Sequence, residues 1–193
     1  MAKDPKYFML NQFDNSGNVQ AYYETTGPEI WKQTNGKTIH FIAGMGASST
    51  LMGAGKYLKE KNLKIQIIGV ELEPNHKIQG LKNMSEAIVP KIYDEFKLDR
   101  KIVTTEQAYK TAREIMRKEG LSAGMSSEAT MYAAIQVAKE VNMGVFVVIV
   151  PDHGFKYLST PLCVSEETLK TLQELSKTFK KSKIEMFKSV EAI

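Results

Sequence analysis

The chain has 193 residues, which is enough for one sizeable hydrophobic core or for one domain with an appendage. Apolar residues make up 42% and charged residues 25%, and the net charge is only +4 with lysines and glutamates interleaved, which argues against a nucleic-acid-binding surface. Cys163 is the only cysteine and no apolar run is long enough to span a membrane, so we predict a cytoplasmic protein with no disulfide and no membrane anchor.

Patterns typical of strands and patterns typical of helices alternate along the chain, which predicts an α/β protein. The first of them, Tyr7–Phe13, predicts a strand that begins almost at the first residue. Short runs rich in β-branched residues then predict strands buried on both faces, at residues 39–43, 65–70, 101–103 and 145–150. Apolar residues at helical spacing predict the helices in between, at residues 22–34, 50–61, 105–118 and 126–141. This alternation indicates an open, mostly parallel sheet with helices on both faces.

The composition divides the chain into a main domain, residues 1–163, and a C-terminal helical tail, residues 164–193. Apolar residues recur at helical spacing on one face of the tail: Leu169, Leu172, Leu175 and Phe179. This spacing predicts one or two amphipathic helices. Such a face usually packs against its own domain, and the alternative is a helix that binds a partner.

The segment Gly44–Thr50, which follows the first buried run, combines glycines with hydroxyl side chains. Gly44 and Gly46 leave room for a ligand close to the backbone, and the hydroxyls can cap a helix or contact an anion. The first amides of the following helix lack partners in that helix and carry partial positive charge. Two interpretations therefore stay open, a phosphate cradle or a capped turn that holds no ligand.

Other loops of small or polar residues fall at the same predicted edge of the sheet: 76–80, 124–127 and 151–160. The spacing of the three histidines matches no metal site, and no nucleophile with a neighbouring base is recognisable. We therefore predict neither a metal nor a catalytic residue within the chain. Gly44 and Gly46, with Glu71 further on, match a dinucleotide fingerprint only weakly, which keeps a weak phosphate- or nucleotide-binding domain as an alternative.

Together these segments resemble the C-terminal part of cysteine synthase and its relative cystathionine β-synthase, which are pyridoxal-phosphate enzymes of fold type II. The resemblance runs from about residue 7 to residue 162 and rests on motifs in the family's order: Asn11-Gln-Phe-Asp-Asn15, Tyr23-Glu-Thr-Thr-Gly-Pro-Glu-Ile-Trp31, Gly44-Met-Gly-Ala-Ser-Ser-Thr50, Ile68-Gly-Val-Glu71, His76-Lys-Ile-Gln-Gly80, Gly124-Met-Ser-Ser127 and Pro151-Asp-His-Gly-Phe-Lys-Tyr-Leu-Ser-Thr160. It implies the large domain of a tryptophan-synthase-β-like fold, truncated at its N-terminus.

The resemblance implies binding roles for two sets of residues. One set holds pyridoxal phosphate, with the phosphate on the turn and the pyridine nitrogen on a serine: Gly46, Ala47, Ser48, Ser49, Thr50 and Ser126. The other set faces the amino-acid substrate: Gln12, Phe13 and Gly80. A neutral serine at the pyridine nitrogen suits elimination and replacement at the β-carbon of an amino acid.

The chain also departs from the family pattern. Ser48 and Ser49 stand where glycine is usual, and either is strained by about 1 kcal/mol if its φ is positive. Ala47 removes a hydroxyl from the turn, and Glu128 places a carboxylate where a small residue is usual.

The family's Schiff-base lysine belongs to a segment that precedes the matched region. The resemblance therefore implies β-replacement, O-acetylserine plus sulfide giving cysteine, while we expect the chain alone not to catalyse it. One alternative is a non-catalytic subunit that pairs with an intact homologue or with a separate N-terminal half. A homo-oligomer is also compatible with the sequence.

Overall fold

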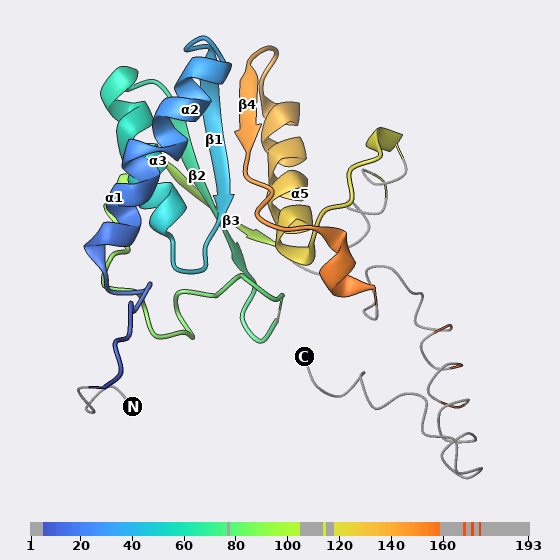
Figure 1. The fold of residues 1–193 in the computed structure, drawn as a ribbon. Coiled ribbons are helices and arrows are strands. Elements are labelled where there is room, and N and C mark those ends of the chain that lie inside the picture. The colour runs from blue at the N-terminus through green and yellow to red at the C-terminus, as the bar shows by residue number, and fades with distance from the viewer. Residues whose placement is uncertain are drawn as a thin grey trace.

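The computed structural model describes residues 6–76, 78–104, 114, 118–158, 168, 171 and 174. Their centre is a four-stranded parallel sheet with the order β3-β2-β1-β4 (Figure 1). The strands are β1 (Thr38–Gly44), β2 (Gln66–Leu72), β3 (Arg100–Thr104) and β4 (Val145–Val148). Each of the buried runs predicted as a strand is therefore confirmed, and so is the parallel α/β fold.

The register brings the carboxyl ends of the two inner strands together. β1 and β2 pair from His40 opposite Gln66 to Gly44 opposite Val70. The loops that follow β1 and β2 therefore leave the sheet at the same edge, which is where ligands bind in open parallel sheets.

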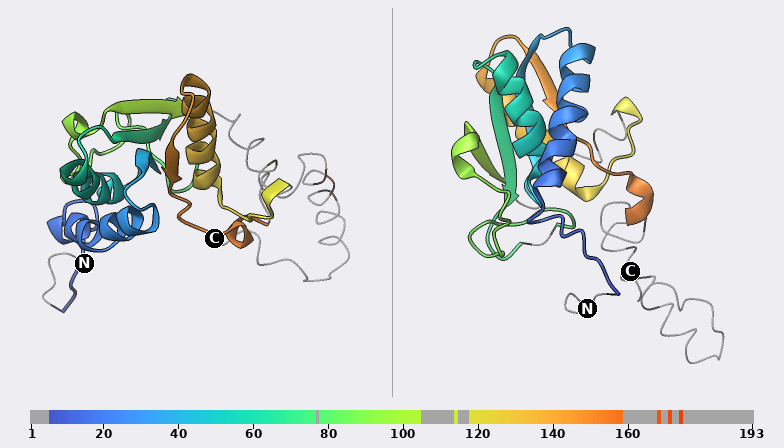
Figure 2. Two further views of the ribbon diagram at one scale, coloured as in Figure 1. Left: turned by 90° about the horizontal axis from the view of Figure 1, so that it is seen from above. Right: turned by 60° about the vertical axis from the view of Figure 1, so that its left-hand side comes forward.

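Helices cover both faces of the sheet, as Figures 1 and 2 show. One face carries α1 (Ser16–Glu24), α2 (Thr26–Gln33) and α3 (Ser49–Lys61), and the other carries α5 (Met125–Glu140). Two short 3-10 helices, η1 (Glu95–Lys97) and η2 (Gly154–Tyr157), lie in the connections.

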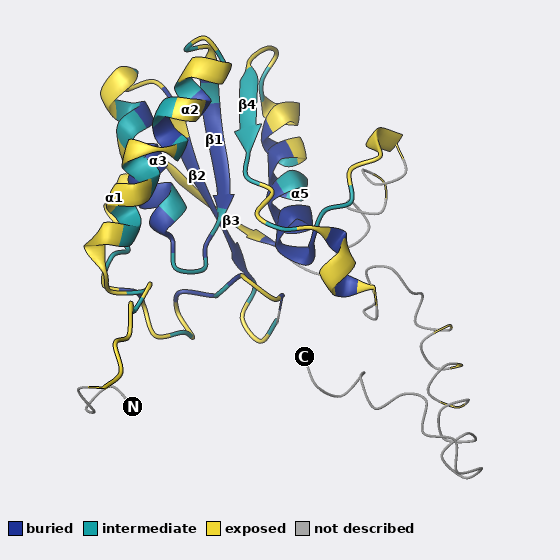
Figure 3. Cartoon of the chain, in the orientation of Figure 1, coloured by how far each residue is buried: buried dark blue, intermediate teal, exposed yellow. Residues whose placement is uncertain are grey.

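The side chains of β1 alternate between two hydrophobic cores. Phe41 packs with Leu51 and Leu58 of α3, whereas Ile42 packs with Ala129 and the rest of the α5 face. Both faces of the inner strands are consequently buried, as the dark blue strands in Figure 3 show. This explains why the strand sequences are continuous apolar runs rather than alternating ones.

The predicted strand at Tyr7–Phe13 is wrong. Its first residues adopt no regular structure, and the side chain of Phe8 is 87% exposed. The chain turns at Asn11, which has a positive φ of 47° and whose carbonyl accepts hydrogen bonds from the amides of Asp14 and Asn15. A turn at this position prevents the segment from forming the extended strand that its apolar residues predict.

The single helix predicted at residues 22–34 is two helices, α1 and α2, which meet at Thr25. The side chain of Asn15 caps α1 by accepting a hydrogen bond from the amide of Gly17 at 2.9 Å. No residue of α1 is buried, so the helix lacks the apolar periodicity that identifies helices in a sequence.

Some predictions concern residues outside the described part of the chain. The helix at 105–118, the domain boundary at residue 163 and the tail at 164–193 lie there, apart from single described positions. Among the residues that the structure describes, no helix combines the length and the apolar character needed to cross a membrane.

His40 makes the stability of the fold depend on pH. Its side chain lies in β1 and stacks on Phe146 with 4.5 Å between ring centroids, and its Nδ1 has no hydrogen-bond partner among the described residues. Burial lowers the pKa of His40 below its ordinary value of 6.5. The unfolded chain is therefore protonated first as the pH falls, so the free energy of unfolding is retained above pH 6.5 and decreases below it, through the folded-state pKa.

Urea unfolding just above and well below pH 6.5 measures this loss of stability. The variant His40→Phe keeps an aromatic ring against Phe146 but cannot be protonated. We expect its unfolding free energy to depend less on pH over the same range. An unchanged pH dependence in the variant would show that other groups cause it.

Candidate functional site

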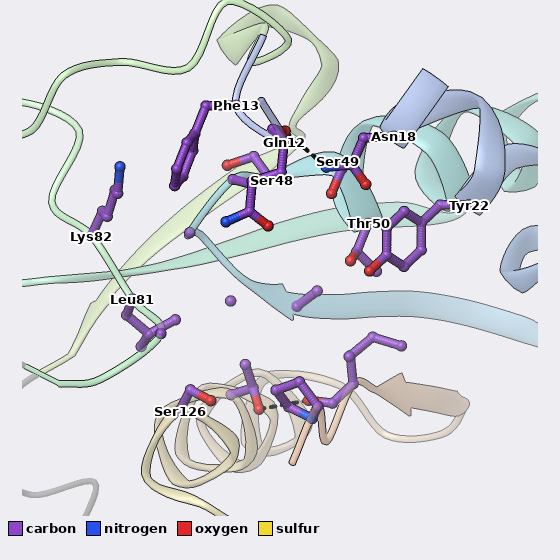
Figure 4. Close-up of a pocket in the computed structure, with 18 residues that line it drawn as sticks. Gln12, Phe13, Asn18, Tyr22, Ser48, Ser49, Thr50, Leu81, Lys82 and Ser126 are labelled. Atoms are coloured by element: carbon purple, nitrogen blue, oxygen red, sulfur yellow. Dashed lines mark hydrogen bonds between the residues drawn. The ribbon is translucent and has the colours of Figure 1, made fainter. Parts of the chain in front are cut away.

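A pocket of about 450 Å³ opens at the carboxyl end of β1, a size typical of small-molecule sites (Figure 4). It lies between two groups of helices, α1 and α3 on one side and α5 on the other. Each of the loops predicted to meet at this edge contributes to it, together with α1, the segment before α1, the end of β1 and the residue after β4. The lining residues are Gln12, Phe13, Asn18, Tyr22, Ala43, Gly44, Gly46–Thr50, Gly80–Lys82, Ser126, Thr130, Ile149 and Pro151.

The turn after β1 presents hydrogen-bond donors to which an anion could bind. Ser48 stands immediately before α3, and its side chain does not cap the helix. Its hydroxyl is buried and has no hydrogen-bond partner among the described residues. The first amides of α3 also lack partners in their own helix, so hydrogen-bond donors and the positive end of the helix dipole converge on this turn.

Ser48 adopts a left-handed conformation with a φ of 66°. In this conformation a serine is strained by about 1 kcal/mol relative to glycine, as expected for a positive φ at this position. Ser49 begins α3 instead and carries no positive φ. Only one of the two serines is therefore strained, and a strained residue that persists beside a pocket is typical of a functional site.

The turn, the Gly80 loop and the start of α5 meet in close contact. A Cβ added to Gly46 would lie 2.6 Å from the carbonyl oxygen of Gly80, so no larger residue fits at this position. Gly80 has a φ of 91°, and a Cβ added there would lie 3.6 Å from the Oγ of Ser126. The Gly80 loop therefore lies between the turn and Ser126, and all three line the same cavity.

The N-terminal segment closes another side of the pocket. The side-chain amide of Asn18 donates to the carbonyl of Gln12 at 2.8 Å, which ties the segment to α1. The ring of Phe13 lies under the ammonium group of Lys82, with 4.0 Å between Nζ and the ring centroid. Gln12, Phe13 and Lys82 therefore form one wall that comes from two distant parts of the chain.

The start of α5 is held by the segment that follows β4. The amide of Gly124 donates to the carbonyl of Asp152 at 3.2 Å. The hydroxyl of Tyr157 donates to Oδ2 of the same aspartate at 2.5 Å, and the Tyr157 side chain is almost fully buried. Burial, and then this hydrogen bond, raise the pKa of Tyr157 above its ordinary value. The pair fixes the backbone two residues before Ser126.

All of the residues to which the resemblance assigns a binding role line this one pocket: Gln12, Phe13, Gly46, Ala47, Ser48, Ser49, Thr50, Gly80 and Ser126. The pocket is also lined by four residues to which no sequence pattern assigned a role: Asn18, Tyr22, Lys82 and Thr130. Thr130 lies one helical turn after Ser126 and so shares its face of α5. Lys82 follows two residues after Gly80, just beyond the loop predicted at residues 76–80.

Glu71, the residue on which the dinucleotide interpretation depends, lies outside the pocket. It is 6% exposed, accepts a hydrogen bond from the amide of Met84 at 3.1 Å and pairs with Lys101 at 3.3 Å. Both oxygens of the Glu71 carboxylate are therefore engaged by partners within the fold. No group of histidine, cysteine, aspartate or glutamate side chains that could hold a metal ion occurs in the described part of the chain.

The sheet and its pocket define the class of protein: an open parallel α/β domain with a pocket at the carboxyl edge of its strands, where such folds bind ligands. Residues 1–152 match the model of a family described as pyridoxal-phosphate dependent enzymes, and the chain belongs to this family. The cofactor of the family is pyridoxal phosphate.

Within the family the chain is similar to cysteine synthases. It is 47% identical over 163 residues to the cysteine synthase of Aquifex aeolicus, covering 81% of this chain and 50% of that protein. It is 37% identical over 197 residues to cysteine synthase A of Escherichia coli K12, covering 90% of this chain and 60% of that protein. The crystal structure of cysteine synthase from Entamoeba histolytica superposes with a TM-score of 0.78 at 33% identity, covering 91% of this chain and 56% of that one. The chain thus spans about half the length of these relatives.

Proposed function

We propose that the chain forms the cofactor-holding part of a cysteine-synthase-type enzyme, which replaces the β-substituent of an activated serine to give cysteine. The observation that carries this proposal is a single pocket lined by every residue to which the resemblance assigns a binding role. Pyridoxal phosphate, when bound, supplies an electron sink for reactions at the α- and β-carbons of an amino acid.

In this proposal the turn after β1 holds the phosphate group. The first amides of α3 donate to it, and the hydroxyls of Ser48 and Thr50 add donors. The fit is supported by the buried hydroxyl of Ser48, which has no hydrogen-bond partner in the described part of the chain and does not cap α3. A phosphate group would supply the acceptors that these donors lack, and it would be stabilised by the helix dipole.

Ser126 serves the opposite end of the cofactor. Its hydroxyl donates a hydrogen bond to the pyridine nitrogen and, being neutral, leaves that nitrogen without a proton. The place of Ser126 in the lining of the pocket, beside Gly80, supports this assignment.

The wall formed by Gln12 and Phe13 receives the amino-acid substrate, with the Gln12 amide near its carboxylate. The bond from Asn18 to the Gln12 carbonyl holds this wall in place. We further propose that the protein works in the cytoplasm. That the chain alone lacks β-replacement activity, and that it pairs with a second chain, stay predictions.

Calorimetric titration of the purified chain with pyridoxal phosphate tests the cofactor assignment. We expect pyridoxal phosphate to bind more tightly than pyridoxal, because only the former carries the group that the turn accepts. We expect Ser126→Ala to weaken binding of pyridoxal phosphate about fivefold, the equivalent of one hydrogen bond of about 1 kcal/mol.

Ser127→Ala is the matched control. Ser127 is the next residue of α5 and is buried, its hydroxyl has no hydrogen-bond partner among the described residues, and it does not line the pocket. Its variant should bind pyridoxal phosphate like the original chain. Equal affinities for pyridoxal and pyridoxal phosphate would refute the phosphate site, and equal losses in both serine variants would refute the role of Ser126.

A further inference from the structure

The pocket contains a buried threonine to which the proposed function gives no role. Thr130 lies in the second turn of α5, is 1% exposed and lines the pocket one helical turn after Ser126. Its hydroxyl lies 2.9 Å from the carbonyl oxygen of Ser127 and 3.1 Å from that of Ile149, and it donates to both. Because a hydroxyl has one proton, the two carbonyls share it, and the threonine connects the first turn of α5 to the segment after β4.

The segment that Thr130 contacts is part of the framework of the sheet. Ile149 directly follows β4, and its amide donates to the carbonyl of Ile42 in β1 at 2.9 Å. The methyl group of Thr130 lies near the end of β1, because a Cβ added to Gly44 would be 3.6 Å from it. Thr130 therefore holds α5 against the end of β1, the strand that leads into the turn proposed to bind phosphate.

The proposed function gives the two sides of this contact to different ends of one ligand. The turn after β1 holds the phosphate group, and Ser126 at the start of α5 holds the pyridine nitrogen. Both groups belong to one compact molecule with a rigid aromatic ring, so the distance between them varies little. Such a ligand binds tightly only where its two anchoring sites are already held at the matching separation.

Another side-chain contact joins α5 to the sheet, at the opposite end of the helix. Arg100, the first residue of β3, donates two hydrogen bonds to the carboxylate of Glu140, the last residue of α5, at 2.6 and 3.0 Å. Both side chains are about half exposed, and neither residue lines the pocket. This ion pair therefore holds the far end of α5, whereas the contact of Thr130 lies next to Ser126.

We propose that Thr130 is a positioning residue, which sets the distance between Ser126 and the phosphate-binding turn by holding the start of α5 against β1. It acts through Ser126 and needs no contact of its own with the cofactor. This inference rests on the proposed function, because the cofactor defines the two anchoring sites.

Calorimetric titration with pyridoxal phosphate tests this role. Thr130→Val keeps the shape of the side chain but removes the donor. We expect it to weaken binding about threefold, less than Ser126→Ala does, because the Ser126 hydroxyl is displaced rather than removed. Thr130→Ser keeps the donor and should bind like the original chain. Thr130→Ala supplies a second variant without the donor in case the valine variant does not fold.

Inorganic phosphate separates positioning from a general loosening of the pocket. It needs only the turn, so its inhibition constant against pyridoxal phosphate should be the same in Thr130→Val as in the original chain. A double-mutant cycle supplies a second test: once Ser126→Ala has removed the positioned hydroxyl, Thr130→Val should cost almost no further affinity. Glu140→Gln is the matched control, because it weakens the contact at the far end of the same helix, and it should leave the affinity for pyridoxal phosphate unchanged.

Several results would each overturn the positioning role while leaving the proposed function intact. They are an unchanged affinity for pyridoxal phosphate in Thr130→Val, an equal loss in Thr130→Ser or Glu140→Gln, an equal weakening of phosphate binding, and losses that multiply in the double variant. Failure of pyridoxal phosphate to bind the original chain would instead overturn the proposed function itself.

Discussion

Gly53→Ala should lower the free energy of unfolding by about 2 kcal/mol, because a methyl group cannot fit where α1 crosses α3. An added Cβ at Gly53 would overlap the carbonyl oxygen of Val19 and lie 2.7 Å from the Cβ of Tyr22. The backbone of α1 would have to move outward. Since Tyr22 lines the pocket from α1, we also expect weaker binding of pyridoxal phosphate.

Gly55→Ala is the control, in the same helix and two residues away. Its added Cβ would lie 3.1 Å from a methyl group of Ile67, a side-chain end that can shift, rather than against a backbone carbonyl. Both substitutions gain the same helix propensity, about 1 kcal/mol, so their difference isolates the helix crossing. Urea unfolding measures both, and a Gly53→Ala variant as stable as Gly55→Ala would show that α1 is not packed tightly on α3.

The sheet and the location of the pocket could be predicted from the sequence because both follow from local patterns. A continuous apolar run such as residues 65–70 occurs where both faces of a strand are covered, and the structure buries β2 on both sides. The glycine and serine residues between 44 and 50 then indicate the turn at which β1 ends and α3 begins. The binding roles came from the family resemblance rather than from these patterns.

The features that sequence reasoning missed depend on contacts between distant segments or on polar helices. No residue of α1 is buried, so Asn15 as an N-cap is the only sequence feature that could have predicted this helix. The apolar residues at 7–10 suggested a strand, but no pattern within the segment shows whether a neighbouring strand exists. The position of Lys82 over Phe13 joins residues 69 positions apart in sequence, which no local pattern can reveal.

Tyr157→Phe should also cost about 2 kcal/mol of unfolding free energy, because it removes the donor that Tyr157 supplies to Asp152. A hydrogen bond to a carboxylate contributes more than one between neutral groups, about 1.5–3 kcal/mol. The other oxygen of this carboxylate, Oδ1, is buried and has no partner among the described residues, so the variant leaves the group poorly satisfied. An added Cβ on Gly124 would overlap the same oxygen, which places the carboxyl directly against the residue that precedes α5.

Tyr93→Phe provides the matched control, since the Tyr93 hydroxyl is also buried but has no hydrogen-bond partner among the described residues. Its removal should leave stability unchanged or slightly higher. Because the Asp152 contact fixes the backbone leading to Ser126, Tyr157→Phe should in addition weaken the binding of pyridoxal phosphate, and Tyr93→Phe should not. Equal losses of stability in the two variants would mean that ring packing, and not the hydrogen bond to Asp152, holds the start of α5 at the pocket.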